Sequence, residues 1–131
     1  MIVQRVGMTV CAVGLMAGLA MAADHTKDTT AEVKKAVEEG KAIFIDVREN
    51  DEWKEGHIVG AKHLALSELK AGVSKEKLKE LLPEGKIVYL HCAAGGRCLK
   101  AADLLKSQGF ETRALKQGYE ALLKAGFDKA K

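Results

Sequence analysis

Two short apolar runs, each followed directly by polar or small residues, constrain the fold of this chain most. Residues 42–46 read Ala-Ile-Phe-Ile-Asp, and residues 87–91 read Ile-Val-Tyr-Leu-His. Runs of this length with no charged residue before the last position are typical of parallel strands that are covered on both faces. Helical patterns stand between and after them. The sequence therefore predicts an α/β fold, with a parallel sheet and helices on both faces.

The helical patterns have recognisable starts and stops. They cover residues 28–40, 74–82, 97–108 and 119–125. Gly40 and Gly109 are suited to end a helix in a left-handed conformation, Ser74 to begin one, and Pro83 to stop one. Weaker patterns predict a short helical turn within residues 49–57, a strand within 61–66 and another strand over 112–115. All of these elements belong to one domain, residues 23–131.

The first 22 residues have the pattern of a secretory signal peptide. A start with one positive charge, Arg5, is followed by an apolar run and then by Ala20-Met21-Ala22, a small-residue cleavage site. The apolar run is about 15 residues long, whereas a bilayer core requires roughly 20. We therefore expect cleavage after Ala22 and export of residues 23–131, to the periplasm where the source has an outer membrane and otherwise to the medium.

Charge and cysteine content exclude several classes of partner. Lys and Arg number 21 against 18 Asp and Glu, and the resulting net charge of +3 is spread along the chain without blocks of one sign. We therefore expect no nucleic-acid partner. We also expect a monomer that does not associate with a membrane after signal cleavage. The two cysteines beyond residue 22 are too few for a disulfide scaffold.

The segment from His91 to Cys98 carries the most chemical information. It joins a predicted strand to a predicted helix, where parallel sheets place their sites, and it reads His-Cys-Ala-Ala-Gly-Gly-Arg-Cys. Small residues at positions 93–96 allow the backbone to curl so that its N–H groups form a concavity for an anion. Amides, a helix N-terminus and the guanidinium of Arg97 all favour a thiolate. We expect Cys92 to be a reactive nucleophile.

Two motifs resemble a known family. Residues 92–97, Cys-Ala-Ala-Gly-Gly-Arg, resemble the active-site loop of rhodanese-like sulfurtransferases. Asp46-Val47-Arg48, with the Glu-Trp and Gly-His-Ile-x-Gly-Ala residues of 52–61, is similar to the second signature of that family. The motifs occur in the family's order, and the resemblance runs from about residue 42 to residue 126.

The resemblance implies a sheet of about five strands and a persulfide mechanism. Cys92 would take sulfane sulfur from thiosulfate or a persulfide and pass it to cyanide or a thiol, without a metal or an organic cofactor. Arg97 and the loop amides, from Ala93, Ala94, Gly95 and Gly96, would stabilise the anionic donor and the persulfide. The fifth strand would have to come from the poorly patterned residues around 27–30, or be missing.

The chain departs from the family pattern at several positions. Val59 and Ala65 stand where proline is frequent, and Gln117-Gly118 stands where a Gly-Gly pair is frequent. Asp46 and Arg48 would either pair with each other or support the loop from the neighbouring strand end, and Arg48 could also attract an anionic donor. Trp53 and Tyr119 are interpreted as packing residues.

Three alternatives to sulfur transfer follow from the same residues. The first is the oxyanion chemistry of related phosphatases and arsenate reductases, which have five residues between cysteine and arginine. Only four residues separate Cys92 from Arg97 here, and this shorter loop is poorly sized for phosphate or arsenate. Cys92 and Cys98 could form a disulfide in a redox or sulfur-carrier protein, although Cys98 falls on the apolar stripe of its helix. The spacing of the histidines and cysteines, including His57 and His63, is not that of a zinc site.

Overall fold

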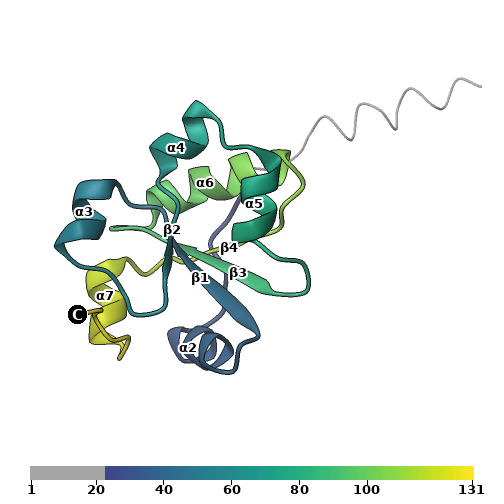
Figure 1. Cartoon of the computed structure of the whole chain (residues 1–131). Helices are drawn as coiled ribbons and strands as arrows, with labels where there is room; N and C mark the ends of the chain where they lie inside the picture. The colour runs from purple at the N-terminus through teal and green to yellow at the C-terminus, as the bar shows by residue number, and fades with distance from the viewer. Residues whose placement is uncertain (1–22) are drawn as a thin grey trace, which may run out of the picture.

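The computed structural model describes residues 23–131, so the predicted signal peptide lies outside the described residues. Helices and strands alternate along this part of the chain, except for two successive helices between the second and third strands (Figure 1). Their bounds are α2 Thr30–Glu38, β1 Ala42–Asp46, α3 Asn50–Glu55, β2 Lys62–His63, α4 Leu66–Ala71, α5 Lys75–Leu81, β3 Ile87–His91, α6 Gly96–Ser107, β4 Arg113–Ala114 and α7 Tyr119–Lys124. None of these helices has the length and apolar character needed to cross a membrane.

The strands form one parallel sheet in the order β2-β1-β3-β4. The two predicted apolar runs, β1 and β3, are the central strands and pair along their whole length. Their register places Asp46 beside His91 at the carboxyl end of the sheet. The residue that follows His91 is Cys92, so the sheet delivers the predicted nucleophile to the edge where parallel sheets bind ligands.

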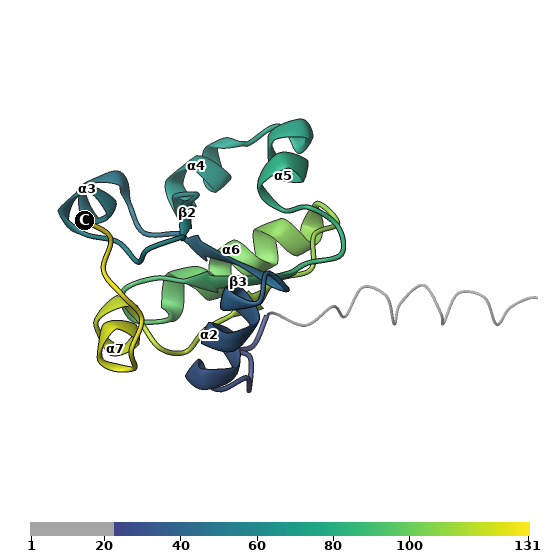
Figure 2. The ribbon, with the colours of Figure 1, turned by 60° about the horizontal axis from the view of Figure 1, so that its bottom comes forward.

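Helices cover both faces of the sheet, as the sequence predicts (Figures 1 and 2). Alternate strand residues divide the core into two clusters: Ile45 and Leu90 face α4, α5 and α6, whereas Phe44 and Tyr89 face α2 and α7. Continuous apolar strands are therefore required because each strand contributes side chains to both layers.

The expectation of about five strands needs correction, because the described sheet has four. The fifth is reduced to one parallel bridge between His25 and Ala114, supported by a 2.8 Å hydrogen bond from the Thr26 N–H to the Ala114 carbonyl. The chain cannot continue as a strand at residues 27–30, because Thr29 already caps α2 by accepting a hydrogen bond from the Glu32 N–H at 3.1 Å.

The strand predicted over residues 61–66 is shorter in the structure, and a helix follows it. Only Lys62 and His63 belong to β2, and α4 begins at Leu66. The sequence does not mark this helix start because Ala65 occupies the N-cap and supplies no side-chain acceptor. Burial of Leu66 and Leu69 stabilises α4 instead. The other predicted elements are found: β1 and β3 have the predicted ends, and the ends of the others are shifted by at most two residues.

Candidate active site

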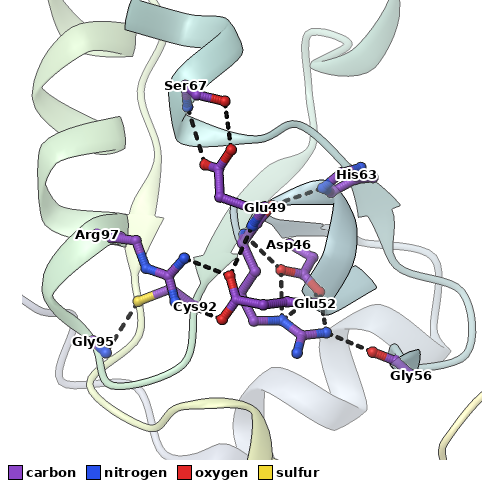
Figure 3. Close-up of polar contacts among 10 residues, drawn as sticks. Asp46, Glu49, Glu52, Gly56, His63, Ser67, Cys92, Gly95 and Arg97 are labelled. Carbon is purple, nitrogen blue, oxygen red and sulfur yellow. Dashed lines mark hydrogen bonds and ion pairs between the residues drawn. The ribbon is translucent and has the colours of Figure 1, made fainter. Parts of the chain in front are cut away.

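The loop between β3 and α6 wraps around the sulfur of Cys92. Gly95 adopts a left-handed conformation, with a φ of 91°, and its N–H donates a 3.0 Å hydrogen bond to Cys92 Sγ (Figure 3). A side chain at Gly95 would be strained at this φ, and its Cβ would lie 2.8 Å from the Lys116 carbonyl oxygen. Nε2 of His25 donates to the Gly95 carbonyl at 2.7 Å. The loop thus contacts His25, which precedes it in the chain, and Lys116, which follows it.

A second segment, residues 115–119, supports the loop from behind. The Tyr119 N–H donates to the Cys92 carbonyl at 2.8 Å. Gly118 packs so closely that a Cβ there would lie 1.8 Å from the Ala93 carbonyl oxygen. The backbone at Gly118 is extended, which any residue could adopt, so the requirement for glycine is purely steric. The sequence singled out this glycine only as half of an incomplete Gly-Gly pair.

The surroundings of Cys92 favour its thiolate. The Cys98 thiol is the main cause that lowers the pKa of Cys92, and the backbone N–H groups of Cys98, Ala94 and Gly95 lower it further. Burial raises the pKa, but the hydrogen bonds outweigh it and bring the pKa to about 5. At neutral pH the Cys92 side chain is therefore ionised, although it is fully buried. A buried thiolate needs this many donors because a charge without partners is costly to bury.

Cys98 lies next to Cys92 and remains protonated. Its Sγ is fully buried in α6 and lies 3.2 Å from the carbonyl oxygens of both Gly95 and Leu115. The hydrogen bond to Cys92 is the largest cause that raises the pKa of Cys98, followed by burial. Both cysteines are free thiols in the structure. Cys98 thus packs in the core, as its helical position suggests, and its side chain also favours the thiolate of Cys92.

Arg97 is bound by a carboxylate to which the sequence assigns no role. Its Nη1 and Nη2 donate to Oε1 and Oε2 of Glu52 at 2.6 and 2.9 Å (Figure 3). Glu52 also accepts a hydrogen bond from the Glu49 N–H, at 3.0 Å. The hydrogen bonds from Arg97, and then from the Glu49 backbone, lower the pKa of Glu52 to about 2 against the effect of burial. The guanidinium of Arg97 is therefore already paired with Glu52 at the predicted site.

Asp46 and Arg48 pair with each other, which is one of the two alternatives left open by the sequence. Nη2 and Nε of Arg48 donate to Asp46 Oδ2 at 2.9 and 3.0 Å, and both side chains are buried. Arg48 Nη2 also donates to the Gly56 carbonyl at 2.7 Å. The guanidinium lies 4.0 Å from the centre of the Tyr119 ring. This pair connects the end of β1 to α3 and α7, beside the loop.

His91 is buried at the end of β3 and is uncharged at neutral pH. Its ring stacks on Phe44 at 4.6 Å, and its Nε2 lies 3.8 Å from Asp46 Oδ2. Burial lowers the pKa of His91 to about 4, while the nearby Asp46 charge opposes this shift. Among residues 23–131, His, Cys, Asp and Glu side chains do not gather in any group of three that could hold a metal ion.

A cavity of about 370 Å³ opens beside the loop. Ala93, which follows Cys92, contributes to its lining, together with Arg48, Gly56 and Tyr119. A larger cavity of about 690 Å³ lies near Lys86 and Val88 at the amino end of β3. Of these two cavities, the smaller is lined by Ala93, the loop residue next to Cys92, whereas the larger is lined by no residue of the loop.

Comparisons with known proteins show the family of this chain. Residues 29–125 match the family described as the rhodanese-like domain. The chain belongs to the rhodanese-like domain family. It is 40% identical over 81 residues to the uncharacterised protein YqhL of Bacillus subtilis, an alignment that covers 61% of this chain and 60% of YqhL. It is also 34% identical over 92 residues to a tRNA sulfurtransferase of Desulfurococcus amylolyticus, covering 70% of this chain and 17% of that protein.

Solved structures confirm the fold of the rhodanese-like domain. The structure of the human single-domain sulfurtransferase TSTD1 matches with a TM-score of 0.59 at 24% identity, covering 80% of this chain and 97% of that one. At this identity the likeness establishes the fold alone. The chain spans 60% and 17% of the two relatives named above, so their complete activities do not transfer to it directly.

Proposed function

We propose that this rhodanese-like domain is a sulfurtransferase that carries sulfane sulfur as a persulfide on Cys92. The observation that carries the proposal is the 3.0 Å hydrogen bond from the Gly95 N–H to the Cys92 sulfur, in a loop that lowers the pKa of Cys92 to about 5. A thiolate held in this way is a nucleophile at neutral pH without a general base. The sulfurtransferase relative gives the proposal further support.

The donor step balances with thiosulfate as substrate. The Cys92 thiolate attacks the outer sulfur of thiosulfate, a new S–S bond forms to Cys92, and the S–S bond of thiosulfate breaks. Sulfite leaves with the electron pair of that bond. The product is an ionised persulfide, whose charge the amides of Gly95 and Ala94 are placed to stabilise. A low-molecular-weight persulfide would serve as donor by the same displacement, with a thiolate as the leaving group.

The acceptor step returns the enzyme to its starting state. The ionised persulfide first takes up a proton from solvent. Cyanide or a thiolate then attacks the outer sulfur, the bond between that sulfur and Cys92 Sγ breaks, and Cys92 departs as a thiolate; the proton leaves on the sulfur that is transferred. The same hydrogen bonds that lower the pKa of Cys92 make it a good leaving group. Neither step requires a metal or an organic cofactor.

Intact mass under non-reducing conditions tests the proposal. Residues 23–131 are measured before and after incubation with thiosulfate, with Cys92→Ser as the matched control. We expect the wild-type protein to gain the mass of one sulfur atom and the variant to gain none. Retention of sulfur transfer in the Cys92→Ser variant would contradict the mechanism.

A redox or sulfur-carrier function is the second candidate, because the Cys98 thiol contacts Cys92. Loss of two hydrogens from the mass of the isolated wild-type protein, with no gain of sulfur, would indicate a Cys92–Cys98 disulfide and favour this function. An arsenate reductase or phosphatase activity has less support, since only four residues separate Cys92 from Arg97 and Glu52 occupies the Arg97 guanidinium.

We also propose that the protein is exported after cleavage at Ala22 and acts as a monomer in the periplasm or outside the cell. The apolar run and cleavage pattern of residues 1–22 support export. The amino-terminal residue of the protein purified from its source is compared with that of the same protein in a whole-cell extract. This comparison tests the proposed cleavage directly. A retained Met1 would overturn it.

A further inference from the structure

The cavity beside Ala93 contains a hydrogen-bonding group with no internal use. The Tyr119 hydroxyl is buried and has no hydrogen-bond partner among residues 23–131. Only 8% of Tyr119 is exposed. A buried hydroxyl without a partner costs free energy, so its retention needs an explanation. A residue needed only for packing at this position would be served as well by phenylalanine.

The position of this hydroxyl is fixed relative to Cys92. The Tyr119 N–H binds the Cys92 carbonyl, and the Arg48 guanidinium lies over the Tyr119 ring. The hydroxyl lies among residues that line the cavity, because a Cβ built on Gly56 would be 2.8 Å from it and 2.6 Å from Cε of Lys129. The tyrosine is thus a rigid donor at a set place beside the loop.

The charged residues of the cavity fall into two groups. Arg48 and Glu52 are already paired, with Asp46 and Arg97. None of the salt bridges within residues 23–131 involves the exposed side chains of Glu55, Glu120 or Lys129, which also line the cavity. The backbone of Lys129 is held at the rim, because its neighbours Asp128 and Ala130 form hydrogen bonds of 2.9 and 2.7 Å to residues 59 and 57.

These groups together suit a ligand with two opposite charges. The Lys129 ammonium and the Tyr119 hydroxyl are donors that fit a carboxylate, and the carboxylates of Glu55 and Glu120 fit an ammonium group. The volume of about 370 Å³ accommodates a small molecule of amino-acid size. A dianionic donor such as thiosulfate gains less here, because two unpaired carboxylates face one ammonium.

We propose that this cavity is the acceptor subsite and that it takes a low-molecular-weight thiol carrying both an ammonium and a carboxylate group. The inference rests on the proposed sulfurtransferase function. The thiolate of the acceptor attacks the outer persulfide sulfur, the bond between that sulfur and Cys92 Sγ breaks, and the electron pair remains on Cys92. The acceptor leaves as a persulfide, so no oxidant or reductant is consumed. The Tyr119 hydroxyl and Lys129 orient the carboxylate of the acceptor during this transfer.

Discharge of preloaded protein tests this inference separately from the donor step. The Cys92 persulfide is formed with thiosulfate, freed of excess donor, and mixed with cysteine, cysteamine or 3-mercaptopropionate at equal thiolate concentrations. Loss of the added sulfur is followed by intact mass. We expect cysteine to discharge the persulfide about tenfold faster than either thiol that lacks one of the two charges.

Variants assign the two halves of the cavity. Tyr119→Phe and Lys129→Met should slow discharge to cysteine and to 3-mercaptopropionate by about tenfold, and should slow discharge to cysteamine much less. The double variant with Glu55→Gln and Glu120→Gln should slow discharge to cysteine and to cysteamine, but not discharge to 3-mercaptopropionate. Lys124 is exposed at the last position of α7 and does not line the cavity. Lys124→Met is therefore the matched control and should behave as wild type.

Cyanide carries neither group and therefore detects general damage to the site. We expect Tyr119→Phe to slow discharge to cyanide much less than discharge to cysteine. Equal slowing with cyanide and cysteine would assign Tyr119 a structural role and overturn the inference, as would equal wild-type rates for the three thiols. Failure to load sulfur at all would instead overturn the proposed function and the inference with it.

Discussion

The carboxylate of Glu52 holds the guanidinium of Arg97 through two hydrogen bonds, of 2.6 and 2.9 Å. This pairing places a negative charge beside the cation that the sequence assigns to the anionic donor. Each side chain is about one-third exposed, at 35% and 33%, so solvent weakens the attraction between them. A donor can therefore compete with Glu52 for Arg97, but it must also overcome repulsion from the carboxylate.

Glu52→Gln should consequently improve binding of thiosulfate. The change removes the negative charge while keeping an oxygen that can accept from Arg97 or from the Glu49 N–H. We expect the KM for thiosulfate to fall about fivefold, equivalent to about 1 kcal/mol. Initial rates with cyanide as acceptor give this value, with Glu68→Gln on the surface of α4 as control. A raised KM would mean that Glu52 is needed to orient Arg97 for the donor.

Cys98 should control the ionisation of Cys92. Removal of its thiol in Cys98→Ala eliminates the main cause of the lowered pKa, so the pKa of Cys92 should rise from about 5 toward the ordinary cysteine value of about 8.5. Cys98→Ser retains a small donor and should stay close to wild type. The ultraviolet absorbance of the thiolate as a function of pH, with Cys92→Ser as blank, measures the pKa.

The same two variants should differ in sulfur loading below neutral pH. Wild-type loading is expected to level off above about pH 6, because the thiolate is then almost complete, whereas Cys98→Ala should keep rising toward alkaline pH. At about pH 6 the alanine variant should load at least about tenfold more slowly. An unchanged pH profile would restrict Cys98 to packing.

Gly118→Ala should disrupt the loop through steric overlap alone. The added Cβ would lie 1.8 Å from the Ala93 carbonyl oxygen, which is backbone and cannot rotate away. Displacement of the loop should lower the free energy of unfolding by about 1–3 kcal/mol and abolish sulfur loading. Gly96→Ala is the control for stability, because a Cβ there has no neighbour within 4 Å; urea unfolding of both variants makes the comparison. Equal stability of the two variants would contradict the steric argument.

The local features of this site are predictable from the sequence, whereas the partners of its side chains are not. The loop from Cys92 to Arg97 is contiguous and follows an apolar run, so the sequence predicts its position at the end of a strand. Glu52 and Arg97 are 45 residues apart, and no periodicity connects them. Their contact exists because α3 and the start of α6 meet at the carboxyl edge of the sheet.

Tyr119 is a second residue whose surroundings cannot be predicted from the sequence. The sequence places it at the start of a helix with apolar neighbours, which supports a packing interpretation. Burial of its ring agrees with that interpretation, but the unpartnered hydroxyl and the adjoining cavity become visible only when α7 is placed beside Gly56 and Lys129. Similarly, α4 forms through tertiary burial of Leu66 and Leu69 without a local capping signal.

His91 should make the stability of the fold depend on pH. Burial lowers its pKa from 6.5 to about 4, so between these values the unfolded chain binds a proton that the folded protein does not. The stability associated with the neutral ring is complete above the unfolded pKa and is lost as pH falls toward the folded pKa. The loss amounts to about 3 kcal/mol for a shift of this size.

Urea unfolding between about pH 7 and about pH 4 checks this dependence. His91→Asn cannot titrate in this range, so its free energy of unfolding should fall less steeply with decreasing pH than that of wild type, even if its stability at neutral pH is lower. The comparison uses the slope and not the absolute stability, because loss of the stacking on Phe44 destabilises the variant at every pH. Parallel slopes would show that another group, and not His91, takes up the proton on unfolding.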